Sequence, residues 1–342
     1  MKAVTIREHG GRDKLLFEEI PDPEVEPGQV RVRVRACGIN HLDIWVRKGL
    51  PHLKLKYPHL LGADIAGEVE TVGPGVHGVT EKERVLIAPG VSCERCQMCL
   101  SGRDNLCSEY GILGESRDGG YAEFLTISAT NLLPYPGDMP FEQAAAIPLT
   151  FQTAWQMLVD KARIQPGEVV LVLAAGSGVG SAAVQIAKLF GATVIATAST
   201  SAKLEKAGEL GADYLVNHST ENWAKEVRLI TGRKGVDVVF EHVGAATWAN
   251  SIRLCASGGR IVTCGSTSGW DAQTDLRQVF FRQISVLGST MGSKAVLFDV
   301  IKHVAAGRLK PVLDRAIPLS EAAEGHRLLE KREVFGKVVL VP

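Results

Sequence analysis

A strand–helix alternation that begins near residue 148 limits the possible folds of this 342-residue chain more than any other feature. The run Val169-Val170-Leu171-Val172-Leu173 is continuously apolar, which is typical of a strand covered on both faces. A helical pattern over 179–190 follows it directly. Further strands are expected over 193–197, 214–216, 236–240 and 260–263, with helices over 201–210, 223–231 and 247–254. Repeated strand–helix units predict a right-handed, doubly wound parallel sheet.

Residues 1–140 have a different texture, with short strands between glycines and prolines. Residues 30–35 alternate valine and arginine at every position, the period of a strand with one buried and one exposed face. Residues 67–73 and 83–87 are similar. This part of the chain therefore predicts a β-barrel or sandwich. A helix over 294–306 and a strand over 337–341 are expected near the end of the sequence.

Four cysteines lie close together in the pattern Cys93-x₂-Cys96-x₂-Cys99-x₇-Cys107. Thiolates at such short spacings can converge on one point, and four of them match the tetrahedral coordination of Zn²⁺. A closed set of four ligands leaves no position for a substrate, so the pattern predicts one structural zinc per chain. The alternatives are weaker, because an iron–sulfur cluster favours a three-residue last gap before proline and disulfides need an oxidising compartment.

Composition argues against several classes of partner. Lys+Arg and Asp+Glu both number 38, so the formal net charge is +0 and gives no electrostatic basis for binding nucleic acid or an anionic membrane. No apolar run approaches the roughly 18 residues of a membrane span. The first seven residues alternate like a strand and do not resemble a signal peptide. Together with reduced cysteines, this favours a cytoplasmic protein.

A glycine-rich turn joins the first buried strand to the first helix, with the sequence Ala174-Ala175-Gly176-Ser177-Gly178-Val179-Gly180-Ser181. Small residues let backbone N–H groups approach a pyrophosphate, and the helix N-terminus favours the anion. The glycine positions of the G-x-G-x-x-G fingerprint read Ala175, Ser177 and Gly180, which are all small. Because the turn lies between a buried strand and a helix, we interpret Gly176, Ser177, Gly178, Val179 and Gly180 as a dinucleotide-binding turn.

The end of the second strand bears on which nicotinamide cofactor binds. An Asp or Glu at this place would bond the ribose 2′-hydroxyl of NAD. The chain instead has Ala198-Ser199-Thr200-Ser201-Ala202-Lys203, with no acid before Glu205. Hydroxyl groups and a lysine suit a 2′-phosphate, so Ser199, Thr200 and Lys203 favour NADP(H) over NAD(H). The alternative is that these residues only cap a helix, since Ser and Thr are good N-caps.

Taken together, these motifs resemble the medium-chain dehydrogenase/reductase superfamily, which contains zinc-type alcohol dehydrogenases and quinone oxidoreductases. The likeness covers nearly the whole chain. It rests on the four-cysteine loop and on four further segments: Pro166–Val172, Val236–Phe240, Gly258-Gly259-Arg260 and Phe335–Leu340. The resemblance implies an α/β protein with two domains. A catalytic chaperonin-10-like β-barrel domain is expected over 1–148 and 286–342, with the zinc loop at 90–110, and a Rossmann domain over 149–285.

The sequence departs from zinc alcohol dehydrogenases at the three catalytic-zinc ligands. The family's Cys-His-Ser/Thr-Asp stretch reads Asn40-His41-Leu42-Asp43, its Gly-His-Glu motif reads Gly62-Ala63-Asp64, and its third ligand falls near Leu149. An amide, an alanine and a leucine do not hold Zn²⁺. Asn at the first place and Gly-x-Asp at the second are similar to zinc-free quinone oxidoreductases. The resemblance therefore implies that the structural zinc is kept and the catalytic zinc is lost.

Without a Lewis-acid metal, another group must stabilise the negative charge that develops on the substrate oxygen. Asn40 is the first candidate donor, and Asp64 is the second candidate catalytic residue. His41 is expected to meet a cofactor phosphate, as the matching histidine does in the enzymes that the chain resembles. Further candidate cofactor contacts are Thr153, Asn217, Val243, Gly265, Ser266 and Lys337.

The resulting hypothesis is an NAD(P)-dependent oxidoreductase that transfers hydride to a carbonyl, quinone or enone substrate without a catalytic zinc. One alternative is an alcohol dehydrogenase acting on small alcohols and on aldehydes or ketones. A second is a non-enzymatic NADP(H)-binding protein. The partners expected are a small-molecule substrate and further copies of the chain, in a homodimer or homotetramer, because the family usually pairs its Rossmann sheets edge to edge. Residues 285–288 could be such an edge strand.

Overall fold

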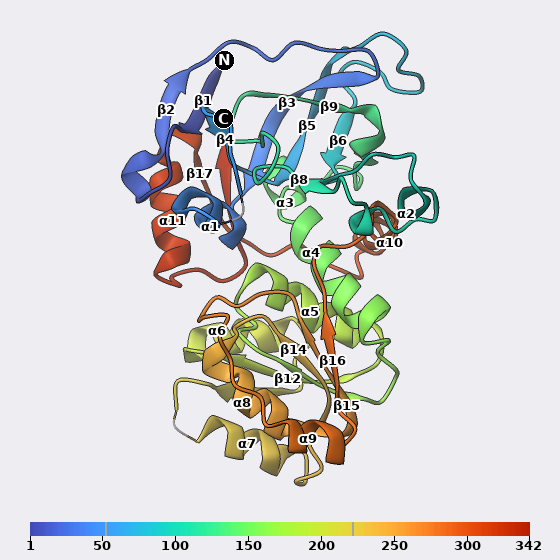
Figure 1. Cartoon of the computed structure of the whole chain (residues 1–342), viewed down its shortest axis with the longest axis vertical. Coiled ribbons are helices and arrows are strands. Elements are labelled where there is room, and N and C mark those ends of the chain that lie inside the picture. The colour runs from blue at the N-terminus through green and yellow to red at the C-terminus, as the bar shows by residue number, and fades with distance from the viewer. Residues whose placement is uncertain (52, 221) are drawn as a thin grey trace. The chain divides into compact units, whose positions relative to one another are not determined.

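The computed structural model describes residues 1–51, 53–220 and 222–342, and the chain divides into two compact units. The first contains Met1–Leu149, Ser293–Gly307 and Pro311–Pro342, and the second contains Thr150–Gly292 and Arg308–Lys310. Figure 1 shows this return of the chain, because red elements from the C-terminus lie among the blue and green ones of the first unit.

The first unit is built on β-strands. Its strands are β1 (Lys2–Ile6), β2 (Leu16–Glu19), β3 (Gln29–Gly38), β4 (His59–Leu60), β5 (Asp64–Val72), β6 (Arg84–Ile87), β7 (Gly90–Val91), β8 (Gly111–Ile112), β9 (Phe124–Ser128), β10 (Leu132–Pro134), β17 (Leu313–Pro318) and β18 (Lys337–Val341). Seven of them form a sheet with the order β10-β6-β5-β3-β18-β17, in which β9 also pairs with β3. Strand β3 therefore meets β5, β9 and β18, and it fixes where the C-terminal strand enters the sheet.

The alternation of β3 has the burial pattern that its sequence predicts. Its valines at 30, 32 and 34 are buried in the core of the first unit. Its arginines point to the other face, where Arg31 and Arg33 pair with Glu70 of β5. The observed fold of this unit confirms the predicted β-rich, chaperonin-10-like domain.

Short helices complete the first unit. They are α1 (His41–Lys48), α2 (Gln97–Leu100), α3 (Phe141–Ala144), α10 (Lys294–Ala305) and α11 (Ala322–Glu330), and the 3₁₀ segments are η1 (Arg12–Lys14), η2 (Asp104–Leu106), η3 (Ala129–Asn131) and η5 (Leu319–Glu321). Helix α1 begins shortly after β3, so the candidate residues Asn40 and His41 lie at the end of a central strand.

The second unit is the predicted doubly wound sheet. Its strands are β11 (Val169–Val172), β12 (Thr193–Ala198), β13 (Tyr214–Asn217), β14 (Val236–Glu241), β15 (Cys255–Thr263) and β16 (Ser285–Gly288). They pair in the order β13-β12-β11-β14-β15-β16, and every pair is parallel. The order reverses between β11 and β14, the point at which such sheets bind a dinucleotide.

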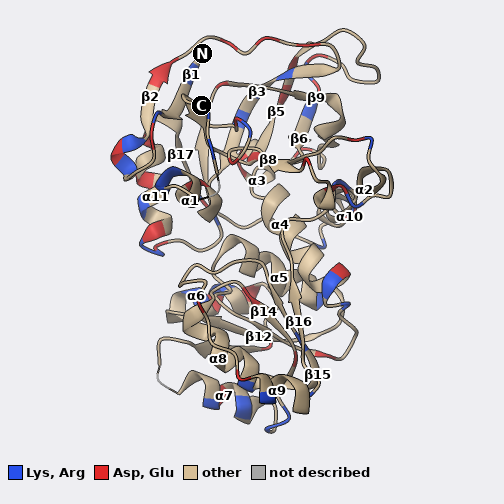
Figure 2. Cartoon of the chain, in the orientation of Figure 1, with Lys and Arg blue, Asp and Glu red and all other residues tan. Residues whose placement is uncertain are grey.

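Helices alternate with these strands. They are α4 (Pro148–Trp155), α5 (Gly178–Leu189), α6 (Ser201–Glu209), α7 (Trp223–Ile230), α8 (Ala245–Leu254) and α9 (Leu276–Phe281), with the π-helical segment η4 (Gln156–Lys161) after α4. Among the described residues, no helix is both long enough and apolar enough to cross a membrane. Figure 2 shows basic and acidic segments interspersed along both units, as the balanced composition predicts.

One boundary differs from the expectation. The first unit resumes at Ser293 and not at residue 286. The reason is that β16 (Ser285–Gly288) pairs along its whole length with β15 and forms the sixth strand of the parallel sheet. Strand β16 is also an edge strand, as the sequence suggested, and Val286 in it is 45% exposed.

Candidate functional site

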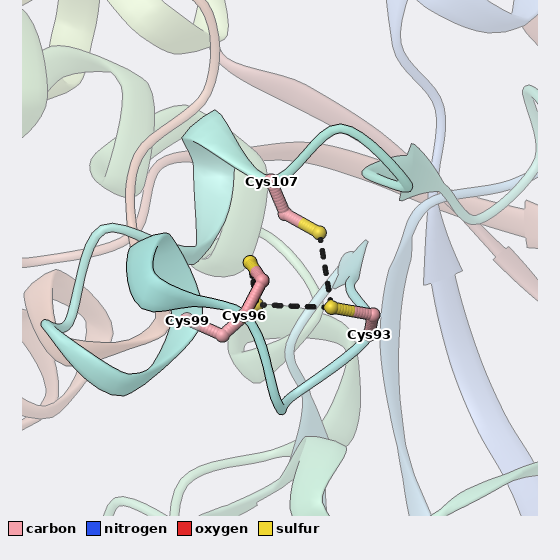
Figure 3. Close-up of side chains that lie close together, drawn as sticks. All are labelled: Cys93, Cys96, Cys99 and Cys107. Carbon is pink, nitrogen blue, oxygen red and sulfur yellow. Dashed lines mark hydrogen bonds between the residues drawn. The ribbon is translucent and has the colours of Figure 1, made fainter.

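The four cysteines of the 93–107 loop converge, as their spacing predicts. Their sulfur atoms all lie within 4.8 Å of one another. The individual Sγ–Sγ distances include 3.5 Å for Cys96–Cys99, 3.5 Å for Cys93–Cys107 and 3.9 Å for Cys93–Cys99 (Figure 3). A tetrahedral zinc with Zn–S bonds of about 2.3 Å places its sulfurs about 3.8 Å apart. The donor set and its spacing therefore fit a closed structural zinc site.

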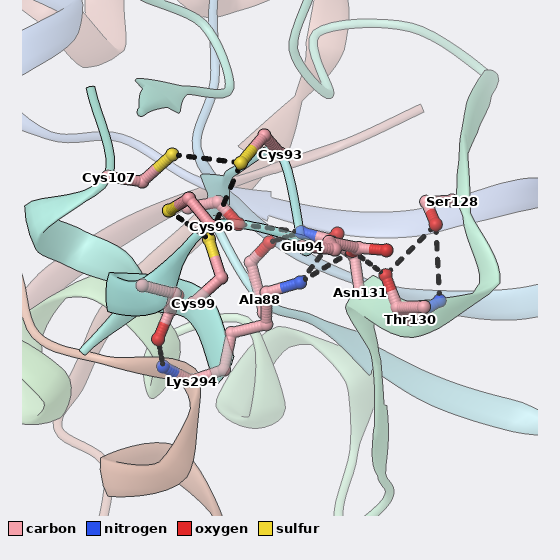
Figure 4. A network of polar contacts seen from close by, with 12 residues as sticks. Ala88, Cys93, Glu94, Cys96, Cys99, Cys107, Ser128, Thr130, Asn131 and Lys294 are labelled. Atoms are coloured by element: carbon pink, nitrogen blue, oxygen red, sulfur yellow. Dashed lines mark hydrogen bonds and ion pairs between the residues drawn. The ribbon is translucent and has the colours of Figure 1, made fainter. Parts of the chain in front are cut away.

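The electrostatics of the loop favour a thiolate. Backbone N–H groups of Arg95 and Cys96 point at the Cys93 sulfur and lower the pKa of that thiol to about 7. The loop is also tied to helix α10, because the Lys294 ammonium bonds Glu94 at 3.1 Å and Asn131 at 3.2 Å (Figure 4). The Asp104 carboxylate accepts the Lys294 backbone N–H at 3.0 Å. The cysteine loop thus anchors the start of α10.

A second cluster of polar side chains lies in the first unit, and it unites both candidate catalytic residues with Lys337. Asn40 follows β3, Asp64 begins β5 and Lys337 begins β18, and these strands are neighbours in one sheet. The Lys337 ammonium donates to Asp64 Oδ2 at 2.7 Å, to Asn40 Oδ1 at 2.6 Å and to the Ile39 carbonyl at 2.8 Å. All three side chains are buried, with Asp64 fully so.

The hydrogen bonds of this cluster account for nearly all of its donors and acceptors. Asp64 Oδ1 accepts the Leu149 backbone N–H at 2.6 Å, and Asp64 Oδ2 accepts both Lys337 and Asn40 Nδ2. The other contact of Asn40 Nδ2 is to the Gly38 carbonyl at 3.4 Å, which is long for a hydrogen bond. One amide hydrogen of Asn40 is therefore held only weakly by the protein.

This cluster does not fit a catalytic zinc. Of the three positions where zinc alcohol dehydrogenases carry ligands, Asn40 offers an amide, Ala63 is buried and has no ligand atom, and Leu149 contributes its backbone N–H to Asp64. Both oxygens of Asp64 are engaged, and the Lys337 ammonium already neutralises its charge. A divalent cation at this place would be repelled by that ammonium and would find no free anionic ligand.

Asp43 holds the two loops that carry the cluster. Its Oδ2 accepts the backbone N–H of Asn40 at 2.6 Å, and its Oδ1 accepts the backbone N–H of Gly62 at 2.9 Å. Burial raises the pKa of Asp43 to about 6, against the opposing effect of these two donors. This role of Asp43 could not be read from neighbouring residues, because nothing local shows that two distant loops meet on one carboxylate.

The predicted dinucleotide turn lies where β11 ends. Ser177 caps α5, and its hydroxyl accepts the Gly180 N–H at 3.0 Å. A side chain at Gly180 would meet the Ala174 carbonyl oxygen at 2.5 Å, so only glycine fits there. The segment Gly176–Gly180 thus forms a tight strand-to-helix turn with a helix N-terminus, the arrangement that binds a pyrophosphate.

The candidate cofactor residues that follow strands of the second unit lie at the same edge of its sheet, because all six strands are parallel. Ser199 follows β12, Asn217 ends β13, Val243 follows β14, and Gly265 and Ser266 follow β15. The Thr200 hydroxyl accepts the Lys203 N–H at 3.4 Å as the N-cap of α6, and the Asn217 amide oxygen accepts the Ser219 N–H at 2.9 Å. These side chains shape their turns, and their cofactor contacts stay predictions.

Three candidates do not follow a strand of the parallel sheet. Thr153 is buried in α4, His41 opens α1 in the first unit, and Lys337 spends its hydrogen bonds within the Asn40–Asp64 cluster. Contacts of these residues with a cofactor also stay predictions. The sequence did not single out Tyr121 and His326, which are buried and hydrogen-bonded to each other next to this cluster, because the two residues are far apart in the chain.

Comparison with known proteins supports the resemblance. Residues 178–306 match the family described as zinc-binding dehydrogenase, and residues 26–137 match the alcohol dehydrogenase GroES-like domain. A 2-haloacrylate reductase from Burkholderia sp is 33% identical, over 99% of this chain and 98% of that protein. The quinone oxidoreductase of Homo sapiens is 29% identical, over 100% of this chain and 98% of that protein.

A solved structure extends the likeness to the whole fold. A crystal structure described as NAD-dependent alcohol dehydrogenase has 54% sequence identity and a TM-score of 0.97, with 100% of both chains covered. These relatives are oxidoreductases, which removes the non-enzymatic alternative. The chain therefore belongs to the medium-chain dehydrogenase/reductase superfamily and is an NAD(P)-dependent oxidoreductase of the zinc-binding dehydrogenase type.

Proposed function

We propose that this protein reduces a conjugated carbonyl compound, such as a quinone or an enone, with hydride from NADPH and without a catalytic zinc. The observation that carries the proposal is the Lys337 ammonium, which is buried against Asp64 and against Asn40, the residue at the first zinc-ligand position of zinc alcohol dehydrogenases. The names of two relatives, a 2-haloacrylate reductase and a quinone oxidoreductase, support an activated alkene or quinone as the acceptor.

The geometry supports a chemical role for the Asn40 amide. A cation that bonds Asn40 Oδ1 at 2.6 Å draws electron density from the amide and strengthens its N–H groups as donors. One of those hydrogens has only the 3.4 Å contact to Gly38. We therefore assign this N–H to the substrate oxygen, where negative charge develops as hydride arrives at the conjugated carbon. Conjugated acceptors suit such a donor, because the negative charge that develops during hydride transfer is spread over the conjugated system.

When bound in the Gly176–Gly180 turn, the nicotinamide cofactor supplies the hydride. The chain's own groups then bind its pyrophosphate at the N-terminus of α5, orient the substrate oxygen at Asn40 and keep a compensating positive charge on Lys337. The proton that completes the reduction comes from water. Asp64 holds the ammonium and the amide in place and does not itself transfer a proton, because both its oxygens are engaged.

Replacement of Asn40 tests this assignment. In Asn40→Ala we expect kcat for a quinone or enone acceptor to fall about 10²–10³-fold, the range seen when one donor to a developing oxyanion is removed. The dissociation constant for NADPH, measured by fluorescence titration, should change less than about twofold. Asn131→Ala is the matched control, because that amide is also buried in the first unit but bonds the Ala88 and Gly90 carbonyls. An unchanged kcat in Asn40→Ala would contradict the assignment.

For the cofactor we propose a preference for NADP(H), on the basis of Ser199, Thr200 and Lys203 after β12 and of the absence of an acid there. The solved relative is described as NAD-dependent, so the choice needs a direct test. We expect kcat/KM for NADPH to exceed that for NADH by about tenfold, equivalent to about 1.4 kcal/mol. Ser199→Asp should reverse the ratio, because it restores the carboxylate that bonds a ribose 2′-hydroxyl. A wild-type preference for NADH would contradict the proposal.

A second candidate function is alcohol dehydrogenation, which the description of the solved relative at 54% identity favours. The two functions separate in one assay, with a panel of small alcohols and NADP⁺ or NAD⁺ beside a panel of quinones and enones with NADPH. Turnover of simple alcohols that survives a chelator would support an alcohol dehydrogenase with a metal-free site. Turnover confined to conjugated acceptors would support the reductase.

We further propose that the protein is cytoplasmic and forms a homodimer or homotetramer. The free cysteines and the loop that fits zinc agree with a reducing compartment. The open edge of β16 supports the assembly, since an exposed edge strand is a ready template for pairing with a second copy.

A further inference from the structure

A carboxylate without a cation is buried at the point where the order of the parallel strands reverses. Glu241 ends β14, which pairs with β11 at that point, and its side chain is fully buried. Its partners are four neutral donors. The backbone N–H groups of Val243 and Gly244 bond Oε1 at 2.7 and 3.0 Å, and the hydroxyls of Thr247 and Ser251 bond Oε2 at 2.9 and 2.6 Å.

The groups that face Glu241 supply no compensating charge. Within the described part of the chain, no ion pair involves this carboxylate, whereas the buried Asp64 is paired with Lys337. Burial lowers the pKa of the neighbouring His242. Burial, and next the Glu241 charge, raise the pKa of Cys264 to about 12. Both neighbours are therefore neutral at physiological pH, and the negative charge of Glu241 stays unbalanced.

The hydrogen bonds of this side chain do not by themselves require a charge. A glutamine of the same size could accept both backbone N–H groups with its amide oxygen. Its NH₂ group would face the two hydroxyls, which can accept and can turn their own hydrogens to carbonyls within reach. Thr247 reaches the Gly244 carbonyl at 3.2 Å, and Ser251 reaches the Thr247 carbonyl at 3.2 Å. Burying an ion without a partner is costly, so a charge kept where an amide would serve indicates an electrostatic role.

The turn that Glu241 holds carries candidate contacts of the nicotinamide. Val243 lies in this turn, and its carbonyl accepts the N–H and the hydroxyl of Ser268 at 2.7 and 2.6 Å. The Glu241 carbonyl accepts the Cys264 N–H at 3.3 Å, directly before the candidate Gly265. Glu241 therefore contacts both segments that follow β14 and β15, in the half of the sheet that takes the second nucleotide of a dinucleotide.

We propose that the negative charge of Glu241 favours the oxidised, cationic form of the nicotinamide cofactor. A nicotinamide ring is neutral in NADPH and positively charged in NADP⁺, because hydride leaves with both electrons of its C–H bond. A fixed negative charge in the protein interior stabilises the cation and leaves the neutral ring nearly unaffected. Glu241 thereby lowers the cost of hydride release to the acceptor. The inference rests on the proposed cofactor site at the ends of the parallel strands, and not on the identity of the acceptor.

Glu241→Gln tests the charge, because it keeps the size and the hydrogen bonds of the side chain. We expect the dissociation constant for NADP⁺ to rise about tenfold, equivalent to about 1.4 kcal/mol, and that for NADPH to stay within twofold. Both constants are measured on the whole chain, by calorimetric titration for NADP⁺ and by fluorescence titration for NADPH. A turn that is merely disturbed weakens both forms alike, so equal changes in the two constants, or none, would overturn the proposal.

Ser251→Ala and Glu241→Asp are the matched controls. The first removes one donor and the second shortens the side chain by one methylene, but both keep the negative charge. In each variant the ratio of the dissociation constants for NADP⁺ and NADPH should stay within twofold of the wild-type ratio, even where both affinities fall. A tenfold shift of the ratio in either variant would overturn the proposal, and this comparison holds even if Glu241→Gln does not fold.

Two further titrations separate this inference from the proposed function. With NAD⁺ and NADH the ratio should shift about tenfold in Glu241→Gln as well, because the charge acts on the ring and not on the ribose. Gly180→Ala tests the cofactor site, because a Cβ there meets the Ala174 carbonyl oxygen at 2.5 Å. Loss of affinity for both forms in Gly180→Ala, with an unchanged ratio in Glu241→Gln, would overturn only the role of the charge. Unchanged affinity in Gly180→Ala would contradict the cofactor site and, with it, this inference.

Discussion

Replacing Lys337 with methionine is expected to lower the free energy of unfolding by about 3–5 kcal/mol and to abolish measurable turnover. The side chain is 4% exposed, and its ammonium forms a buried ion pair with the Asp64 carboxylate. Methionine has a similar length and no charge, so the variant leaves a buried carboxylate uncompensated. The change should be measured by denaturant unfolding at pH 7, with the rate of quinone reduction measured on the folded fraction.

The control is Lys302→Met, on the exposed face of α10. Lys302 also forms an ion pair, with Asp299 at 3.2 Å, but both side chains are more than half exposed. We expect Lys302→Met to lower the free energy of unfolding by less than about 0.5 kcal/mol, because exposed ion pairs contribute little to stability. Adding Asp64→Asn to Lys337→Met should recover stability without recovering turnover, since it removes the unpaired charge but not the need for a cation beside Asn40. A double variant no more stable than the single one would show that Asp64 is not the source of the loss.

The second large effect is expected at the four-cysteine loop. Cys99→Ser should reduce the zinc content from one per chain to nearly none, and the first unit should lose about 4 kcal/mol or more of stability, as proteins that lose a structural metal do. Amide exchange should become fast over 93–107 and at the start of α10, because Glu94 and Asp104 hold Lys294. The second unit should keep its exchange protection and its affinity for NADPH.

Cys255→Ala is the control for this experiment. Cys255 is buried in the core of the second unit and is not part of the sulfur cluster. The variant should therefore keep one zinc per chain, and its free energy of unfolding should fall only by the cost of a small cavity. If NADPH affinity collapsed in folded Cys99→Ser, the loop would have a role beyond structure.

The predictable parts of this protein are those encoded by neighbouring residues. The valine–arginine alternation of β3, the buried run of β11 and the cysteine spacing each depend on local periodicity or short loops, and the structure confirms all three. The predicted start of the second segment of the first unit, at residue 286, was wrong, because β16 at the edge of the parallel sheet has the same local pattern as a strand of the first unit.

The interior of the candidate site could not be derived in the same way. Asn40 and Lys337 bond across 297 residues of sequence, and Tyr121 and His326 across 205. No periodicity links such positions, and a lysine at the start of a strand is ordinarily solvated. The resemblance identified Asn40, Ala63 and Leu149 as the replaced ligand positions, but only the fold shows that Lys337 compensates the charge of Asp64 beside Asn40.

Zinc content per folded chain distinguishes a protein with one structural zinc and a metal-free reaction site from a protein that also holds a catalytic zinc. The measurement is elemental analysis of protein purified without a metal-binding tag and normalised to folded chains. We predict one zinc per chain, held by Cys93, Cys96, Cys99 and Cys107. Two per chain, with the second lost in Asp64→Asn, would contradict the account and would mean that Asn40 and Asp64 help to hold a catalytic metal.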